Sequence, residues 1–333
     1  MSLLRDRLAD LPSPDEGARA AVAERATEVL RPVGALAWLD AVATWLAGWQ
    51  RTTTPRVERP AALVFAADHG VAAAGVSNYP SEITSSMLTA TRGGQATINA
   101  FARSVGASVT AVDVGVGRPT GDMRREPALS EARVEDITAA AFAAVDALDC
   151  DLLVLGELGI GNTTAAAAVA AAFAGGEATV WVGRGSGVDD AGLARKRAAV
   201  QEAVRRIAGV VDPLEILREV GGSELVAIAA ATVAARHRSI PIVLDGYICT
   251  ASVLPLREAE PSALDHCIVG HCSAEPGHRL LLDRLGTEPL LALDMRLGEG
   301  TGAMAAVPLV RMACAGVTEV PTFGEWAAEH ADR

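Results

Sequence analysis

The chain has 333 residues, 50% of them hydrophobic, and its mean hydropathy is +0.27. This length suits one large α/β domain with a small companion, and the apolar content is ample for a core. A formal net charge of −12 repels polyanions, which excludes nucleic acid and anionic membrane surfaces as partners. No apolar run approaches the roughly 18 to 20 residues that span a bilayer, and the first residues lack the continuous apolar segment of a signal peptide.

The cysteine usage indicates the compartment. The five cysteines have no CxxC pairing and stand mostly in apolar sequence, at positions 150, 249, 267, 272 and 314. This pattern is typical of reduced thiols. We therefore expect a cytoplasmic protein without a disulfide framework.

The first 50 residues favour helices, which prolines divide into short pieces. Trp38, Trp45 and Trp49 recur at helical spacing within them. Such a stripe packs a helix against the body or a partner subunit more often than it forms an aromatic site. A polar, proline-bounded linker then runs from Gln50 to Pro60 and leads into a sheet.

After the linker, strands and helices alternate. The first expected strand, Ala61–Ala67, ends in Asp68-His69-Gly70, and polar groups at the carboxyl end of an apolar strand lie where α/β sheets bind ligands. The long loop that follows contains Gly75 and Pro80, which forbid a simple helix, and such loops are more often functional than not. Further strands are expected at 108–114, 152–156, 178–182, 240–244 and 290–293, with helices between them. The alternation predicts an α/β fold.

The segment from Leu152 to Phe173, LLVLGELGIGNTTAAAAVAAAF, is typical of a strand, a glycine-rich loop and a helix. Gly159 and Gly161 let the backbone turn sharply and approach a ligand, and the start of the alanine-rich helix supplies unpaired N–H donors for an anion. Glu157 would repel a phosphate at close range, so we place it beside the anion. There it accepts hydrogen bonds from ligand hydroxyls or orients a reacting group. The loop is neither GxxxxGK[ST] nor GxGxxG, and a turn without a ligand is the alternative.

A second glycine-rich turn, GRGSGVDD, follows the β-rich run at 178–182 and again precedes a helix. That helix contains Lys196, the only lysine in the sequence. A compact ammonium suits a tight phosphate contact, whereas arginine is a broad fork, although drift in composition would also leave a single lysine. Two such loops at one edge of a sheet indicate a ligand site more strongly than one loop does.

Histidines and cysteines crowd together in CIVGHCSAEPGH, so a zinc site has to be considered. Their spacing fits neither paired CxxC ligands nor HExxH. The segment instead favours a strand, a capping Ser273 and the start of a helix. We therefore expect no metal.

Six motifs follow one another between about Ala61 and Gly316: ADHGVAAAGVSNYPSEIT, GELGIGNTT, GRGSGV, LDGYICTA, GHCSAEPGH and RLGEGTGA. Together they resemble the family of nicotinate-nucleotide:dimethylbenzimidazole phosphoribosyltransferases, which act in assembly of the cobalamin nucleotide loop. The resemblance implies a Rossmann-like, mostly parallel sheet flanked by helices, and a small helical domain built from both chain termini. Residues 1–58 and the tail 317–333 would form the small domain, and residues 59–316 the large catalytic domain. The resemblance also implies a homodimer without a cofactor or metal.

By this resemblance, the family's catalytic carboxylate matches Glu299 in LGEGTGA, and a second active-site carboxylate matches Glu157. The base pocket would include Tyr79, Ser86 and Leu297. Family members often carry Gln at the position of Ser86, so the resemblance does not determine which aromatic base is accepted. The expected ligands of the phosphoribosyl group are Gly159, Gly161, Asn162, Gly185, Lys196, Asp245, Gly246 and Ser273.

The resemblance implies transfer of the phosphoribosyl group of nicotinate mononucleotide to 5,6-dimethylbenzimidazole, which gives α-ribazole 5'-phosphate and nicotinate. The pyridinium leaves as a neutral ring and needs no general acid, whereas the attacking benzimidazole loses a ring proton to one base, Glu299. A negative charge on Glu157 would stabilise an oxocarbenium-like ribose. Because the loops offer no obvious nucleophile, we expect a single displacement with inversion at the anomeric carbon.

Two functions from other classes compete with this one. A Rossmann-type NAD-dependent oxidoreductase would use the same glycine turns for a pyrophosphate, but GxGxxG and the acidic ribose ligand about 20 residues further on are missing. A non-catalytic nucleotide-binding module would bind the mononucleotide without turnover. Release of nicotinate from a mixture of the protein, the mononucleotide and the benzimidazole separates all three.

Overall fold

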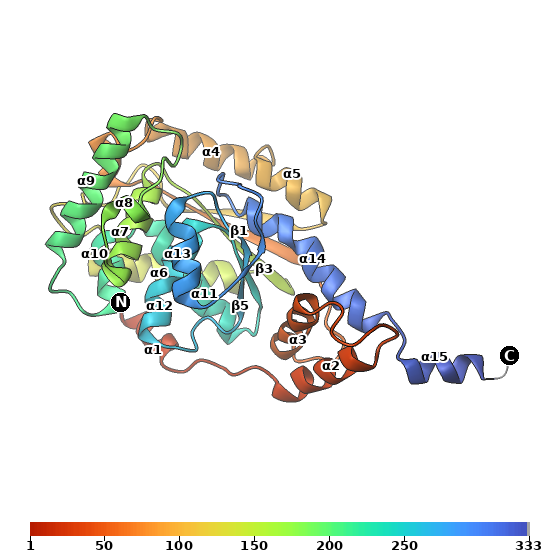
Figure 1. Ribbon diagram of the computed structural model, residues 1–333. Coiled ribbons are helices and arrows are strands. Elements are labelled where there is room, and N and C mark those ends of the chain that lie inside the picture. The colour runs from red at the N-terminus through yellow and green to blue at the C-terminus, as the bar shows by residue number, and fades with distance from the viewer. Residues whose placement is uncertain (332–333) are drawn as a thin grey trace.

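A parallel sheet forms the centre of the computed structural model, which describes residues 1–331 (Figure 1). Its six strands lie in the order β2-β1-β3-β4-β5-β6, and every neighbouring pair is parallel. β1 and β3 are buried along their whole length, as expected of apolar strands covered on both faces. The strands are β1 (Pro60–Ala67), β2 (Ser108–Gly115), β3 (Leu152–Leu158), β4 (Ile242–Leu244), β5 (Cys267–His271) and β6 (Pro289–Leu291). The expected α/β fold with a parallel sheet is confirmed.

Helices cover both faces of this sheet (Figure 1). One face is covered by α6 (Glu131–Asp146), α11 (Ser223–His237) and α12 (Tyr247–Ala259). Outside α12 lie α7 (Asn162–Ala174), α9 (Asp190–Arg206), α10 (Pro213–Val220) and α13 (Pro276–Leu285). The other face is covered by α4 (Glu82–Arg92), α5 (Thr97–Ser104) and α14 (Thr301–Thr318). The alanine-rich α11 is buried on nearly all sides, which small side chains permit.

The strand order creates a crevice at one edge of the sheet. From β1 the chain passes to β2 on one side, and β3 then pairs with β1 on the other side. The loops after β1 and β3 therefore diverge. At such a switch point, α/β sheets bind ligands outside the carboxyl ends of the strands. The first turn after β1 is a short 3-10 helix, η1 (Gly70–Ala74).

The two ends of the chain meet beside α14. α2 (Glu16–Glu28) and α3 (Trp38–Gln50) pack together and against α14, which extends away from the sheet toward α15 (Phe323–His330) (Figure 1). Val29 forms an antiparallel bridge with Thr322, and the Arg25 guanidinium lies 3.1 Å from the carboxylate of Glu325. The boundaries at residues 58 and 316 stay predictions, and residues 332 and 333 of the expected tail lie outside the described residues.

The tryptophans of α3 have different environments. Trp45 and Trp49 are buried, and each donates its indole N–H to the carbonyl of Asp265 at 3.0 Å. The packing interpretation is therefore confirmed for these two residues. Trp38, at the start of the helix, is 48% exposed.

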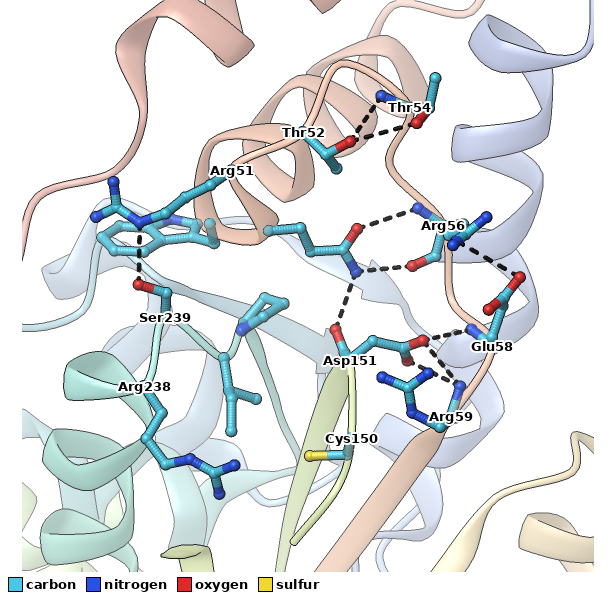
Figure 2. A pocket seen from close by; sticks show the side chains of 14 residues that line it. Arg51, Thr52, Thr54, Arg56, Glu58, Arg59, Cys150, Asp151, Arg238 and Ser239 are labelled. Carbon is cyan, nitrogen blue, oxygen red and sulfur yellow. Dashed lines mark hydrogen bonds and ion pairs between the residues drawn. The ribbon is translucent and has the colours of Figure 1, made fainter.

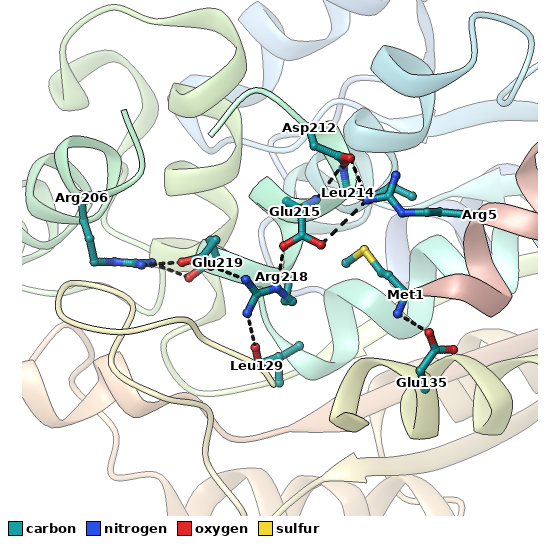
Figure 3. A network of polar contacts seen from close by, with 10 residues as sticks. All are labelled: Met1, Arg5, Leu129, Glu135, Arg206, Asp212, Leu214, Glu215, Arg218 and Glu219. Carbon is teal, nitrogen blue, oxygen red and sulfur yellow. Dashed lines mark hydrogen bonds and ion pairs between the residues drawn. The ribbon is translucent and has the colours of Figure 1, made fainter. Parts of the chain in front are cut away.

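α1 (Ser2–Leu8) lies apart from α2 and α3 and packs on α6 and α11. Polar contacts connect it to these neighbours (Figure 3): the ammonium of Met1 contacts Glu135 of α6, and Arg5 pairs with Asp212 at 2.8 Å, directly before α10. The first helix thus belongs to the helices around the sheet, whereas we expected all of residues 1–58 in the small domain.

The linker between α3 and β1 is held by polar contacts at the amino edge of the sheet (Figure 2). The side-chain amide of Gln50 donates to the carbonyls of Arg56 and Asp151, at 2.7 and 3.0 Å. The Asp151 carboxylate accepts the backbone N–H groups of Glu58 and Arg59. These contacts line a cleft of about 560 Å³. Because the polar groups satisfy one another, we assign this cleft to seating the linker.

The prediction of a strand at 178–182 is wrong. The segment forms a short helix, α8 (Ala178–Trp181). The β propensity of threonine, valine and tryptophan depends on a sheet surface to pack against. Here Ala178 and Trp181 are buried in contacts of α8 with α7, α9 and α13. Helix packing therefore decides the local structure.

We expected no segment able to span a membrane, but α14 is long and apolar enough to do so. Residues such as Ala303, Met304 and Val307 are fully buried in its contacts with the sheet and α3. The core helix of a soluble protein meets the same criterion, and the burial indicates that role here. All five cysteines are free.

Candidate active site

The carboxyl ends of the strands open into a cavity of about 730 Å³. Its wall comes from α4, from the loops that follow β1, β3, β4, β5 and β6, and from the turn between α8 and α9. Apolar side chains alternate there with four carboxyl groups, those of Glu157, Asp245, Glu275 and Glu299. The cavity therefore occupies the crevice at the switch point, and both expected catalytic glutamates line it.

Glu157 is the second-last residue of the buried strand β3. Its Oε2 accepts a hydrogen bond from the side-chain amide of Asn162, the first residue of α7, at 2.5 Å. Burial raises the pKa of Glu157 well above its usual range, and the charges of Asp245 and Glu224 raise it further. A negative charge on Glu157 during the reaction stays a prediction.

Glu299 is held in a left-handed backbone conformation. Its φ is 63°, between Gly298 at 85° and Gly300 at 87°. A non-glycine residue in this region costs about 1 to 2 kcal/mol, so the surroundings must hold it. The Glu299 N–H donates to the carbonyl of Glu157 at 3.2 Å. At Gly156, a Cβ would stand 2.5 Å from the Glu299 carbonyl, so glycine permits the close approach of β3.

The Glu299 carboxyl group is buried, and its Oε2 has no hydrogen-bond partner among the described residues. Burial raises the pKa of Glu299, a backbone hydrogen bond from Ile98 opposes this shift, and the charge of Asp245 adds to it. A carboxylate with a raised pKa is a better proton acceptor near neutral pH.

Asp245 directly follows β4 and caps the helix after Glu299. Its Oδ1 accepts the N–H of Ala303 at 2.9 Å, and its Oδ2 accepts the N–H of Gly300 at 3.2 Å. His271 Nε2 lies 3.4 Å from Oδ1. Asp245 lines the cavity beside Gly246, where we expected the ribose, but its own hydrogen bonds fix the start of α14.

The opposite end of the cavity carries the features of an anion site. Lys196 is only 1% exposed, and its Nζ donates to Oγ1 of Thr163 in the first turn of α7 at 2.9 Å. Burial lowers the pKa of Lys196, and the charge of Glu275 opposes this shift. Gly161 caps α7 in a left-handed conformation, and Asn162 and Thr163 of its first turn line the cavity, which places the positive end of the helix there. The N–H groups of Asn162 and Thr164 donate to the carbonyls of Gly159 and Gly161. Gly161, Thr163 and Gly185 line this end of the cavity and Lys196 lies behind Thr163, so the two glycine-rich loops lie together; their binding of a phosphate stays a prediction.

We expected Gly185 to hold the phosphate, but its backbone N–H is bonded within the protein. Its N–H donates to Oε1 of Glu275 at 2.9 Å, and Ser273 Oγ in turn accepts the Glu275 N–H at 3.2 Å. A Cβ at Gly185 would stand 2.9 Å from Lys196 Nζ. Gly185 thus permits the approach of the lysine, while its own N–H already has a partner.

Comparison with known proteins agrees with this geometry. A family model described as Phosphoribosyltransferase matches residues 11–327. The chain belongs to this family. It is 47% identical over 325 residues to the nicotinate-nucleotide--dimethylbenzimidazole phosphoribosyltransferase of Mesorhizobium japonicum, covering 97% of this chain and 96% of the relative. The protein of the same name from Cereibacter sphaeroides is 46% identical over 95% and 93% of the two chains.

A solved structure gives the same result for the fold. The crystal structure of CobT from Thermus thermophilus superposes with a TM-score of 0.89 at 41% identity, over 93% of this chain and 98% of that one. The family resemblance that the six sequence motifs indicated is therefore confirmed. The chain is a pentosyl-transferring enzyme by family.

Two of the three residues expected in the base pocket line the cavity, and their contact with a base stays a prediction. Tyr79 and Leu297 line the cavity and are exposed at its mouth. Ser86 lies outside it, because it stands on an exposed face of α4, where its hydroxyl donates to the carbonyl of Glu82 at 3.4 Å. Sequence reasoning missed the side chains that α4 does present, Ile83, Thr84 and Met87. The spacing of Ile83 and Met87, one helical turn apart, was the available signal.

The polar end of β1 lies beneath the site and not in it. His69 contacts Glu224 through Nε2, and both side chains are buried. A Cβ at Gly159 would stand 2.7 Å from Glu224 Oε1, so the pair supports the glycine-rich loop from below. Sequence reasoning also missed this supporting role of Glu224.

The histidines and cysteines near β5 have structural contacts. Burial lowers the pKa of His278 to about 3, and its Nδ1 accepts the N–H of Ser273 at 2.8 Å. Within residues 1–331, no group of three or more His, Cys, Asp or Glu side chains is arranged to hold a metal ion. A neutral His278 instead shapes the Ser273 turn.

Proposed function

We propose that this protein transfers the phosphoribosyl group of nicotinate mononucleotide to 5,6-dimethylbenzimidazole, giving α-ribazole 5'-phosphate and nicotinate, in synthesis of the lower ligand of cobalamin. The observation that carries the proposal is the pair Glu157 and Glu299, joined through their backbones at the wall of a cavity that ends in an anion site. Near-full-length relatives bear the name of this reaction.

The anion site would hold the 5'-phosphate. The start of α7 supplies the positive partial charge of a helix N-terminus, and Lys196 of α9 lies behind Thr163 of that first turn. A dianion at this point would stabilise the charged form of the buried lysine. Gly246 and Ser273, which line the cavity between the two ends, would face the ribose.

Glu299 would accept the proton that the benzimidazole loses. The ring nitrogen attacks the anomeric carbon, the C–N bond to the pyridinium breaks, and its electron pair neutralises the leaving ring. The other benzimidazole nitrogen then transfers its proton to the carboxylate oxygen. The unpartnered, buried Oε2 of Glu299 and its raised pKa support this role.

Glu157 would respond to the charge of the substrate. A cationic pyridinium and an oxocarbenium-like ribose both favour an ionised neighbour, so they would lower the pKa that burial raises. The amide of Asn162 holds the side chain in place for this role. An ionised Glu157 would stabilise the positive charge that develops on the ribose in the transition state.

Proton NMR of a mixture of the protein, nicotinate mononucleotide and dimethylbenzimidazole tests the reaction. We expect free nicotinate and a ribosyl product with the α configuration, because direct displacement of a β-linked pyridine inverts the anomeric carbon. A β product, or an adduct on Glu157, would contradict direct displacement. Absence of nicotinate release would contradict the proposed function itself.

We infer a cytoplasmic homodimer from the same family resemblance. Exposed apolar side chains on α14 and α15 support a subunit interface near the C-terminal helices: Met312, Phe323 and Trp326. The free state of all five cysteines supports a reducing compartment. Light scattering after size exclusion measures the subunit number directly.

A further inference from the structure

The charge of the cavity wall is unbalanced. Four carboxyl groups line it, whereas Arg296 is the only arginine or lysine among the described residues that does so. Arg296 stands three positions before Glu299 in an exposed loop. It reaches across to the turn between α8 and α9, where Nη1 donates to the carbonyl of Gly185 at 2.9 Å.

The guanidinium of Arg296 has capacity for a second partner. Its bond to Gly185 is its only hydrogen bond to the part of the chain that the structure describes, and none of the ion pairs there includes Arg296. Arginine has five N–H donors in a planar fork, which matches the two oxygens of a carboxylate. The side chain lines the cavity and is exposed, so a ligand in the cavity can reach the remaining donors.

Nicotinate mononucleotide carries two anionic groups, the 5'-phosphate and the carboxylate of the pyridine ring. The phosphate would use Lys196 and the start of α7. The ring carboxylate then has to lie in a cavity whose wall carries four further carboxyl groups. Without a cation, that wall would favour nicotinamide mononucleotide, because its amide is uncharged.

We propose that Arg296 binds the carboxylate of the pyridine ring and thereby selects nicotinate mononucleotide over nicotinamide mononucleotide. This inference rests on the proposed function, since it assigns a partner to one group of that substrate. Arg296 would act as a specificity determinant: it contacts the leaving group and takes no proton.

The variants Arg296→Gln and Arg296→Lys test the assignment with both mononucleotides and the same benzimidazole. For Arg296→Gln we expect kcat/KM for the acid to fall roughly 10- to 100-fold, the usual range for a lost charged hydrogen bond. Turnover of the amide should change less than about threefold, so the preference for the acid collapses. Arg296→Lys keeps the charge without the fork and should lie between.

Arg184→Gln is the matched control. This arginine lies in the same turn as Gly185, but its guanidinium bonds Val188 and Asp190 and does not line the cavity. We expect it to keep the wild-type preference. If Arg296→Gln lowers kcat/KM equally for both mononucleotides, Arg296 holds the phosphate or the loop and the inference is wrong.

Inhibition by fragments separates the same alternatives when turnover is too low to measure. Arg296→Gln should weaken inhibition by free nicotinate at least tenfold and leave inhibition by ribose 5-phosphate unchanged. Weaker ribose 5-phosphate inhibition with unchanged nicotinate inhibition would place Arg296 on the phosphate. A wild-type protein that turns over neither mononucleotide would refute the proposed function, a result distinct from a shared loss in the variant.

Discussion

Glu299 combines a constrained backbone with an unsatisfied carboxyl group, and that combination makes it sensitive to a small change. Glu299→Gln keeps the shape of the side chain but removes its ability to accept a proton. We expect the fold and the affinity for nicotinate mononucleotide to persist, while turnover falls by roughly 10² or more. Rates of nicotinate release and calorimetric binding measure the two quantities. Glu202→Gln, at an exposed position of α9, is the control. A variant at Glu299 with near wild-type rates would remove this residue from the mechanism.

The raised pKa of Glu299 determines the sign of the pH dependence. Below that pKa the carboxyl group is protonated and cannot accept the benzimidazole proton, so kcat/KM should increase with pH through the raised pKa. The acidic limb should therefore lie above the usual glutamate value of about 4.3. Glu157 also has a raised pKa, so the titrations of the two carboxyl groups have to be distinguished. If Glu299 causes the acidic limb, the limb should persist in Glu157→Gln. A limb that Glu157→Gln abolishes would assign the titration to Glu157 instead.

Single residues of the site were predictable where their local sequence determines their conformation. The glycines around Glu299 and the strand before Glu157 are local signals, and both carboxyl groups line the cavity. Glu275 and Arg296 were not predictable in this way. They meet Gly185 across 90 and 111 residues of sequence, so only the arrangement of the loops shows their contacts.

At the scale of elements, the site depends on the close approach of β3 to the start of α14. Gly156→Ala would place a Cβ 2.5 Å from the carbonyl of Glu299 and from the backbone nitrogen of Gly300. Backbone atoms cannot rotate away as the end of a flexible side chain can. We expect a loss of stability of about 1 to 3 kcal/mol and at least a tenfold loss of turnover, because Glu299 is displaced. Chemical denaturation and nicotinate release measure both.

Gly209→Ala is the control for that substitution. No heavy atom lies within 4 Å of a Cβ at Gly209, so the alanine should be tolerated. If Gly156→Ala unfolds and turns over like wild type, the close contact with Glu299 does not position the base.

The elements themselves were predictable where an apolar run is long enough to be buried on both faces, as in β1 and β3. The segment 178–182 is also rich in residues that favour strands, but it is short and pairs with no strand of the sheet. Its contacts with α7 and α13 are tertiary, which is why local propensity gave the wrong structure. Ser86 is a similar case, since one position on α4 decides whether a side chain faces the cavity.

At the scale of the whole molecule, α3 joins the N-terminal helices to the amino edge of the sheet, opposite the cavity. Trp49 is 1% exposed, its ring lies 4.1 Å from the guanidinium of Arg236, and its indole bonds Asp265 directly before β5. Trp49→Ala should therefore lower the free energy of unfolding by about 3 to 5 kcal/mol. Trp38→Ala on the same helix, at a half-exposed position, should change it by about 0.5 kcal/mol or less. Denaturant midpoints at equal slopes provide the comparison.

Because the cavity lies at the other edge of the sheet, turnover of the folded Trp49→Ala protein should remain near wild type. Equal destabilisation by the two variants would show that α3 does not anchor the terminal helices through Trp49.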